Sequence, residues 1–367
     1  MSLSILGLGT ALPKTAVNQA DAVTVATRVC CRTDEQAEWL PKLYEHTGIQ
    51  KRHLAFGQDV VDDILAGTHT SGSIFLPDPD KDQGPSTSQR MEHYRHRAAP
   101  LALEAARRAL DESRVAEESI THLVTVSCTG FYAPGVDVEL IQSLGLSASV
   151  ERTHIGFMGC HGALNGLRVA RAYADSSPDA RVLLCAVELC VLHYHYLWDP
   201  KRMVANALFA DGAAAVVGAQ APGIPDPQWR LTRSGASIFP DCRYAMTWDI
   251  SDHGFVMSLS TRVPALIAEH LHPWVEKWLA REGLGLGDVA SWAVHPGGPR
   301  IVSAVEEALG LSQDDTAVSL EVLAECGNMS SPTILFIIDR LRRREAPRPC
   351  VALGFGPGLA VEAALFA

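Results

Sequence analysis

The stretch from Gly156 to Ala170, GFMGCHGALNGLRVA, places a cysteine where an irregular segment gives way to a helical pattern. The thiolate is the reactive form of cysteine, and the partial positive charge of a helix N-terminus lowers the pKa of a thiol. Gly159 and Gly162 remove side chains near the sulfur, allowing a sharp turn and close approach of a substrate. Cys160 is therefore a candidate nucleophile, although a lone cysteine is more often buried and without chemistry.

A cysteine nucleophile usually works with a base and with donors that stabilise negative charge. His295 ends an apolar strand and is followed by a proline and two glycines (WAVHPGGP), which fix its backbone and leave one face open. Asn328, in ECGNMSSPT, precedes the apolar helix TILFIIDRL. Its side chain could bond backbone amides of that helix or donate to a developing oxyanion. Taken singly, the histidine could equally be an ordinary turn residue.

A metal site is the weaker interpretation of Cys160. The pair Cys160-His161 lacks a second cysteine or histidine at ligand spacing, and the next candidates follow only at Cys185 and beyond, in and after a buried strand. Zinc sites normally show tighter pairs of ligands. We therefore expect no metal here.

The elements that must position these residues alternate between strands and helices in two similar series. In each series a strand precedes a loop rich in reactive groups, VSCTG and FMGC in the first, AVHPGG and ALGFGPG in the second. This order predicts two related α/β halves, residues 1–222 with the cysteine and 223–367 with the histidine and asparagine, joined at a proline-rich stretch near 219–228. The expected strands are 4–8, 49–56, 122–127, 181–187, 209–218, 229–234, 291–294, 349–354 and 359–366, and the expected helices 33–47, 98–113, 136–143, 162–175, 263–281, 301–309 and 333–344. The polar stretch 55–89 is expected to be a long surface excursion.

Composition narrows the class of protein. The chain has 367 residues, of which 47% are hydrophobic and 20% charged, so a large core is expected and global disorder is not. A net charge of −11 argues against a general nucleic-acid binder. The N-terminal residues do not resemble a signal peptide, and no apolar run reaches the roughly 20 residues that span a membrane. The nine scattered cysteines are expected to be reduced thiols of a cytoplasmic protein.

Five ordered motifs together resemble the type III polyketide synthases, the chalcone-synthase-like enzymes of the thiolase fold. They are GFMGCHGALNGLRVA, LFADGAAAVV, WAVHPGGPRIVSAVEEALGL, CGNMSSPTILFIIDRL and GFGPGLAVEAAL. The resemblance implies an α/β thiolase fold with duplicated βαβαβ halves in a five-layer α-β-α-β-α sandwich, and a homodimer. It also implies a catalytic triad of Cys160, His295 and Asn328, and no cofactor.

The implied reaction begins when an acyl-CoA starter is loaded onto Cys160. Malonyl-CoA then loses CO₂, and the enolate, stabilised by Asn328 and His295, attacks the acyl thioester in a decarboxylative Claisen condensation. Iteration and cyclisation would give a pyrone, a resorcinol or a related ring.

The resemblance also marks a substrate cavity. Phe209 matches one of two gatekeepers between the CoA tunnel and the cavity, and Met257 stands where plant enzymes have a second, aromatic one. Gly356 and Pro357, in GFGPG, are expected in a tight loop at the cavity floor.

Other cavity positions depart from the plant enzymes. Cys128, beside Thr129, replaces a threonine, as in bacterial members of the family, which suggests a bacterial origin. His193 replaces a small hydroxyl residue, and Trp248 replaces glycine. Both fill space, which predicts a differently partitioned cavity, such as a narrow channel for an acyl chain, although Trp248 could equally be plain core.

Local cations must receive the polyanionic CoA on an acidic protein. Lys42 matches one basic CoA-binding position of the family, His46 replaces another basic residue, and Arg300 is a further candidate. Each could equally be a solvated surface charge.

Two alternatives remain open from the sequence. A β-ketoacyl synthase III shares the triad but makes one condensation with an acyl-carrier protein, and a non-catalytic thiolase-fold protein would only bind acyl groups. The GFGPG motif and the long HPGGPRIVSAVEEALGL match argue against the first, and the complete triad argues against the second.

Overall fold

The computed structural model describes residues 2–78, 82–220 and 229–367. The strands are β1 Leu3–Ala11, β2 Thr15–Asn18, β3 Lys51–Leu54, β4 His122–Ser127, β5 Glu151–Gly156, β6 Arg181–Leu189, β7 Asp211–Ala219, β8 Arg230–Ile238, β9 Met246–Ser251, β10 Gly254–Leu259, β11 Ser291–Val294, β12 Cys350–Gly356 and β13 Ala360–Phe366. The α-helices are α1 Gln19–Cys30, α2 Asp34–Glu45, α3 Gln58–Ala66, α4 Thr87–Ser113, α5 Val136–Leu144, α6 Gly162–Ser176, α7 Pro200–Leu208, α8 Val263–Ala280, α9 Pro299–Leu309, α10 Gln313–Cys326 and α11 Pro332–Arg343. Short 3₁₀ turns are η1 Glu117–Ser119, η2 Gly159–His161, η3 Cys190–His193, η4 Leu286–Asp288 and η5 Pro357–Leu359.

The pairing of strands repeats within the main sheet, whose order in the described residues is β11-β12-β13-β8-β1-β7-β6-β4-β5. In the first set, β4 is parallel to β6, β6 is antiparallel to β7, and β7 is antiparallel to β1. In the second set, β11, β12, β13 and β8 follow the same sequence of one parallel and two antiparallel pairs. A short antiparallel contact of β1 with β8 joins the sets. The chain is therefore built from two duplicated halves.

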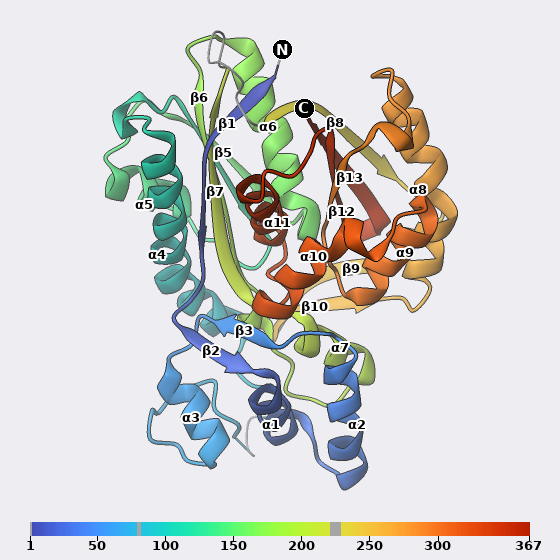
Figure 1. Ribbon diagram of the computed structural model, residues 1–367. Coiled ribbons are helices and arrows are strands. Elements are labelled where there is room, and N and C mark those ends of the chain that lie inside the picture. Colours follow the sequence, from blue (N-terminus) through green and yellow to red (C-terminus); the bar gives the residue numbers. More distant parts are fainter. Residues whose placement is uncertain (1, 79–81, 221–228) are drawn as a thin grey trace.

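Three hydrophobic cores form where the layers of helices and strands pack together. One lies between the two sets of strands and includes apolar residues of the central helices α6 and α11. A second packs α4 and α5 on the outer face of the first set, and a third packs α8 and α9 on the outer face of the second. Strands β7 and β12 are buried throughout, as strands covered on both faces must be. Figure 1 shows this succession of helices and strands, which confirms the predicted five-layer thiolase sandwich.

A smaller lobe lies against one end of the sandwich (Figure 1). It contains the β2–β3 pair with α1, α2, α3 and α7, and has its own core of residues from these elements, including Val29, Leu40 and Met203. Its helix α2 begins at a capping box formed by Thr33 and Gln36. The lobe covers the end of the sandwich where the candidate site residues lie.

The prediction for residues 55–89 was wrong in part. Helix α3 lies within this stretch, and Val60, Val61 and Phe75 are buried in cores. The loop after α3 folds around the Asp63 carboxylate, which accepts hydrogen bonds from the Thr70 and Ser71 backbone amides at 2.9 and 2.6 Å. Hydrogen bonds from the Ser71 and Thr68 side chains, together with the Ser71 N–H, hold the pKa of Asp63 well below its usual range. The polar composition predicted a loop here, but it did not indicate that the Asp63 carboxylate would order it.

Some helices and strands are longer than predicted, and others were not predicted at all. Strand β1 continues to Ala11 rather than stopping at Leu8, and α4 begins at Thr87 rather than Ala98. The Ser86 and Gln89 side chains form a capping box at that earlier start. Seven further elements were not predicted: β2, α1, β5, α7, β9, β10 and α10.

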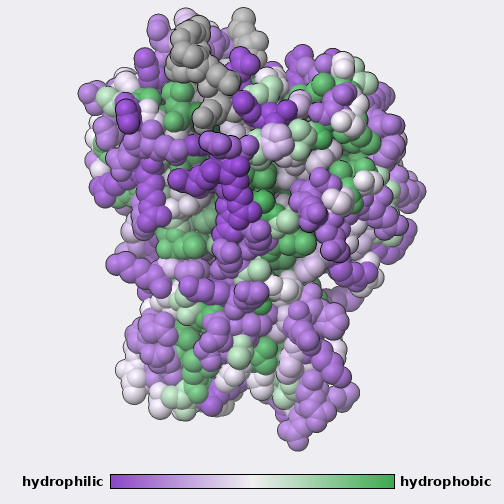
Figure 2. All heavy atoms as spheres, in the orientation of Figure 1, coloured by the Kyte–Doolittle hydropathy of each residue, from purple (hydrophilic) through white to green (hydrophobic). Residues whose placement is uncertain are grey.

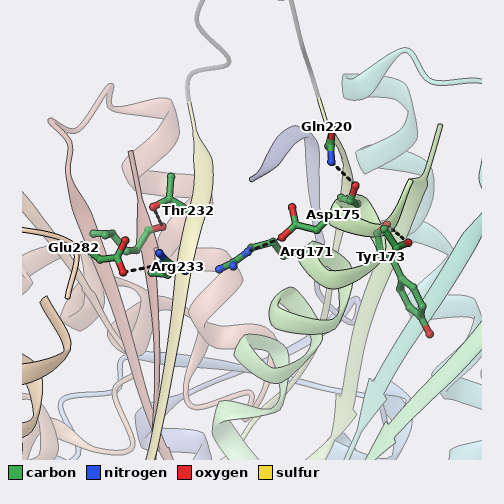
Figure 3. Close-up of polar contacts among 10 residues, drawn as sticks. Arg171, Tyr173, Asp175, Gln220, Thr232, Arg233 and Glu282 are labelled. Carbon is green, nitrogen blue, oxygen red and sulfur yellow. Dashed lines mark hydrogen bonds and ion pairs between the residues drawn. The ribbon is translucent and has the colours of Figure 1, made fainter. Parts of the chain in front are cut away.

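The predicted boundary at 222/223, within the join near 219–228, lies outside the described residues. The strands that lead toward it are tied to their own halves (Figure 3). After β7, Gln220 donates to the Ala174 carbonyl of α6 at 2.7 Å, and in β8 Arg233 pairs with Glu282 at 2.6 Å.

Hydrophilic residues cover most of the face seen in Figure 2, and hydrophobic ones show in patches between them. In the described part of the chain, no helix has the length and apolar character needed to cross a membrane.

Candidate active site

The duplication brings four side chains that could take part in a reaction to one end of the sandwich. Cys160 lies just before the central helix α6, and Asn328 lies shortly before the central helix α11 of the other half. Cys128 follows β4, and His295 follows β11, the strand that takes the place of β4 in the second half. The two halves thus contribute matched pairs to a single site.

Cys160 lies in a tight turn that its neighbours determine. Phe157 and Gly159 have left-handed backbones, with φ of 57° and 73°. A Cβ on Gly159 would lie 2.5 Å from Cδ of Pro357, and one on Gly162 would lie 2.9 Å from Cγ1 of Val126. Both glycines therefore permit close packing inside the protein, and Gly159 also supplies the predicted sharp turn and lines the cavity beside Cys160.

Burial dominates the environment of the Cys160 thiol and raises its pKa to about 11. Hydrogen bonds from the Ser330 and Asn328 side chains act in the opposite direction. In the absence of a charged partner, burial therefore outweighs the lowering of the Cys160 pKa that was expected from the helix N-terminus. A thiolate at this position needs a cation to form beside it.

His295 is the group that could become this cation. It is 1% exposed, and its backbone N–H donates to the Leu353 carbonyl on the neighbouring strand β12 at 2.8 Å. Neither ring nitrogen has a hydrogen-bond partner among the described residues. Burial and, to a lesser degree, His161, the residue after Cys160, lower the pKa of His295 to about 3. The ring is neutral and free to exchange a proton.

His161 is held by a buried chain of polar contacts that sequence reasoning missed. Its Nδ1 lies 2.7 Å from Oδ1 of Asn165, whose amide donates to Glu362 at 2.7 Å, and Glu362 pairs with Arg168 at 2.7 Å. Gly356 makes room for this ring, because a Cβ there would lie 2.4 Å from His161 Cδ2. The GFGPG motif therefore packs against the turn of Cys160.

Asn328 is fixed by both its backbone and its side chain. Its N–H donates to the Leu208 carbonyl at 3.0 Å, and its carbonyl accepts from Ala210 N–H at 2.9 Å. Oδ1 accepts from the Ser330 N–H at 2.8 Å, which leaves the side-chain NH₂ to donate toward Cys160. The side-chain oxygen therefore bonds a backbone amide, one of the two alternatives that the sequence left open, and the NH₂ group remains for the other.

Glu188, at the end of β6, is a buried carboxylate that was not predicted. It accepts hydrogen bonds from the Cys128 N–H at 2.9 Å, the Thr129 hydroxyl at 2.7 Å and the Ser331 hydroxyl at 2.6 Å. Burial raises its pKa. A charged residue ending the apolar run RVLLCAVEL was the available signal, because glutamate is rarely fully buried without partners. Through these bonds Glu188 joins the loop after β4 to the start of α11.

A small cavity of about 30 Å³ adjoins the thiol. Trp248 forms part of its wall and is fixed there, since its Nε1–H donates to the Cys128 carbonyl at 2.7 Å and its ring lies 6.4 Å from that of Phe209. Trp248 and Met257 are directly paired on β9 and β10. The lining residues are Cys128, Thr129, Gly159, Cys160, Cys190, Phe209, Met246, Thr247, Trp248, Met257, Ser330 and Pro357.

His193 and Gly356 were expected in this cavity but are not among its lining residues. His193 lies behind the wall, with its ring stacked on Phe255 at 4.0 Å and edge-on to Trp248 at 5.7 Å. Its Nε2 donates to the Thr129 carbonyl at 2.6 Å and its Nδ1 accepts from Phe255 N–H at 3.0 Å. Burial lowers its pKa to about 3, so it is a neutral support for Trp248.

The three candidate CoA ligands lie on the surface of adjacent elements. Lys42 and His46 are exposed at the C-terminal end of α2, and Arg300 is exposed in the first turn of α9. The turn after α2 faces the start of α9, because a Cβ on Gly48 would lie 3.8 Å from Pro299. In the described residues no group of three or more His, Cys, Asp or Glu side chains is arranged to hold a metal ion.

Comparison with known proteins agrees with this architecture. Residues 2–222 match the N-terminal domain of chalcone and stilbene synthases, and residues 230–367 match the C-terminal domain. The chain therefore belongs to the chalcone and stilbene synthase family and is a type III polyketide synthase, an acyltransferase.

Relatives match along nearly the whole chain. An "Alpha-pyrone synthesis polyketide synthase-like Pks18" of Mycobacterium tuberculosis is 33% identical over 99% of this chain and 90% of its own. Bisdemethoxycurcumin synthase of Oryza sativa is 32% identical over 99% of this chain and 91% of its own. The crystal structure of PKS-I from the brown alga Ectocarpus siliculosus superposes with a TM-score of 0.92 at 33% identity, covering 100% of this chain and 98% of that one.

Proposed function

We propose that this protein loads an acyl-CoA starter onto Cys160, extends it with malonyl-CoA and closes the product to a pyrone, a resorcinol or a related ring. The observation that carries the proposal is the meeting of the Cys160 thiol with the Asn328 amide at the starts of the two central helices, beside a small cavity. The name of the mycobacterial relative, which refers to alpha-pyrone synthesis, supports the pyrone among these products.

Loading requires a proton to move. The Cys160 thiol passes its proton to His295, the thiolate attacks the acyl-CoA carbonyl, and CoA leaves as a thiolate that takes the proton back. Burial raises the pKa of Cys160 and lowers that of His295, so each charge alone is disfavoured. Formed together they attract one another in a poorly solvated site, which offsets the effect of burial on each.

Extension uses the same donors in neutral form. Malonyl-CoA breaks its C–C bond to CO₂, and the electron pair moves onto the thioester oxygen as an enolate. The NH₂ of Asn328 and the neutral ring of His295 would donate to this oxygen. The enolate carbon then attacks acyl-Cys160, and the sulfur leaves as a thiolate ready to accept the longer chain.

Substituting His295 by alanine should change how alkylation of Cys160 by iodoacetamide depends on pH. Without imidazole the thiol is left with burial, which raises its pKa to about 11, so the thiolate fraction falls about tenfold for each pH unit below that value. The variant's rate should rise about tenfold per unit from pH 7 to pH 10, whereas the wild-type rate should flatten at lower pH. If the two proteins gave parallel pH profiles, His295 would not be the proton acceptor of the Cys160 thiol.

Trp248 limits the cavity, so replacing it by glycine should allow at least one further extension. The indole lines a space of about 30 Å³, too small for a polyketide chain. Mass spectrometry of products from hexanoyl-CoA and malonyl-CoA would measure their length. Trp274→Gly removes the same side chain from the outer helix α8 and should leave product length unchanged. Identical products from a folded Trp248→Gly enzyme would contradict the role.

The whole reaction is tested without a carrier protein. Acyl-CoA starters of different length and malonyl-CoA are incubated with the purified enzyme, and products are identified by mass spectrometry. Cyclised products extended by two or more units support the proposal. A single β-ketoacyl product that appears only with acyl-carrier protein would favour the ketosynthase III alternative.

The substrates would enter from the surface that carries Lys42, His46 and Arg300. We assign these exposed groups to the CoA phosphates, because they lie on facing ends of α2 and α9. Since acyl-CoA and malonyl-CoA are made inside the cell, a cytoplasmic location is part of this proposal.

The homodimer is also part of the proposal. Strand β5 lies at one end of the main sheet and exposes alternate residues, which leaves an edge for pairing. Phe131, 52% exposed, lies beside it at a cavity of about 640 Å³ lined by residues including Arg152 and His154. A second copy of the chain is the occupant, and sedimentation of Phe131→Asp as a monomer and of wild type as a dimer would support it.

A further inference from the structure

Arg52 is a buried cation in the middle of the lobe that covers the site. It lies on β3 and is 4% exposed. Its guanidinium donates to the Gln19 side-chain oxygen at 2.9 Å and to backbone carbonyls, and it lies 5.3 Å from the ring centroid of Tyr44. All of these acceptors are neutral. Its Nε makes no hydrogen bond with the described residues.

The carbonyls that Arg52 binds belong to the end of α7. The last carbonyls of a helix lack partners within the helix, and when buried they need donors from elsewhere. Arg52 supplies them for Asn206 at 3.0 Å, Ala207 at 2.8 Å and Phe209 at 3.5 Å. The carbonyl between them, that of Leu208, accepts the backbone N–H of Asn328 at 3.0 Å. Arg52 and Asn328 therefore share one helix end.

This helix end leads directly into Phe209 and is bridged to Asn328. Phe209 and Asn328 form an isolated parallel β-bridge, and the N–H of Ala210 donates to the Asn328 carbonyl at 2.9 Å. From this arrangement we infer that Arg52 is a positioning residue that holds the Asn328 amide and the Phe209 ring in place for decarboxylation and extension. The inference rests on the role proposed for Asn328.

A guanidinium suits this position because its planar fork can serve several carbonyls at once. Lysine carries a single nitrogen and cannot reach all three. With no carboxylate among its partners in the described residues, the charge acts on the backbone carbonyls, the Gln19 side-chain oxygen and the Tyr44 ring. A cavity of about 60 Å³ with largely apolar walls adjoins Arg52 and Phe209, so the helix end has space to relax when the guanidinium is lost.

The test separates loading from decarboxylation in Arg52→Met and Arg52→Lys. Loading is read as the hexanoyl adduct on Cys160 after addition of hexanoyl-CoA, and decarboxylation as acetyl-CoA formed from malonyl-CoA. We expect loading within about threefold of wild type, and decarboxylation reduced about 10–100-fold in Arg52→Met and less in Arg52→Lys, since small displacements of reacting groups have effects of this size. Guanidinium ions at millimolar concentration should restore part of the decarboxylation in Arg52→Ala.

The matched control is Arg90→Met. Arg90 is fully buried and donates to the carbonyls of Pro85, Leu192 and Tyr194, none of which lies in α7. It should lower thermal stability without separating the two half-reactions. An equal loss of both activities in Arg52→Lys, or the same separation in Arg90→Met, would overturn the inference.

Asn328→Ala, measured alongside, distinguishes the two proposals. If Asn328→Ala decarboxylates malonyl-CoA slowly but the folded Arg52 variants decarboxylate it at the wild-type rate, the positioning role of Arg52 is wrong and the proposed role of Asn328 stands. If Asn328→Ala is itself unaffected, the proposed role of Asn328 fails, and the inference fails with it.

Discussion

Replacing Cys160 by alanine should give an enzyme that forms no acyl adduct with hexanoyl-CoA and no extended product. The thioester needs a sulfur in the turn between β5 and α6, and removal of a catalytic nucleophile typically lowers turnover by at least about 10⁴-fold. Malonyl-CoA should still lose CO₂, because Asn328 and His295 lie on the other half of the chain and remain in place. Intact-protein mass spectrometry measures the adduct, and acetyl-CoA formation measures the decarboxylation.

The neighbouring thiol Cys128 provides the matched control. It lines the same cavity, and its sulfur lies 3.4 Å from the Ser330 hydroxyl, which also hydrogen bonds to Cys160. Burial raises the pKa of Cys128 well above its ordinary value, and the Glu188 carboxylate raises it further, so this thiol should stay protonated. Cys128→Ala should therefore keep the adduct. An adduct that persists in Cys160→Ala, or is lost in Cys128→Ala, would show that Cys160 is not the nucleophile.

The layered core was predictable because its elements carry strong periodic signals. The apolar run Arg181–Val187 and the helix from Gly162 show the spacing of a buried strand and of a helix packed on it. The repeated order of strands and loaded loops also indicated duplication, and the sheet pairing bears this out. Burial on both faces leaves few alternatives for such segments.

The lobe and the β9–β10 hairpin were less predictable, since long-range contacts determine them. The hairpin lines the cavity and is held there by a bond from Trp248 to the Cys128 carbonyl, 120 residues away in the sequence. Helix α7 is short and ends on the guanidinium of Arg52, 154 residues from Asn206. No local pattern encodes these partners.

The candidate site divides in the same way. Cys160, His295 and Asn328 stood out because each lies in a turn at the end of a periodic element. Glu188 and Ser330 were missed because their importance comes from contacts between the halves, such as the bond from the Ser331 hydroxyl to Glu188. His193 was expected in the cavity because it matches a small hydroxyl residue of the plant enzymes, but its larger ring stacks on Phe255 and lies behind the wall.

Asn328→Ala should slow malonyl-CoA decarboxylation by about 10²–10³-fold, the usual result of removing one donor to a developing oxyanion. The loss should fall on decarboxylation rather than loading, because the thiol and His295 remain. In the wild type, Oδ1 is occupied by the Ser330 N–H, so the NH₂ group alone faces the thiol. The hexanoyl adduct should therefore still form on Cys160, which also shows that the variant is folded.

Asn328→Asp sharpens this test because it keeps the shape of the side chain and the acceptor for Ser330 N–H while removing the donor. An ionised carboxylate would also repel the enolate, so decarboxylation should be slower than in Asn328→Ala at pH 8. Lowering the pH should narrow the gap as the carboxyl group is protonated and regains a hydrogen to donate. If instead both variants decarboxylate at the wild-type rate, the enolate is stabilised elsewhere, and His295 would be the remaining donor from the second half.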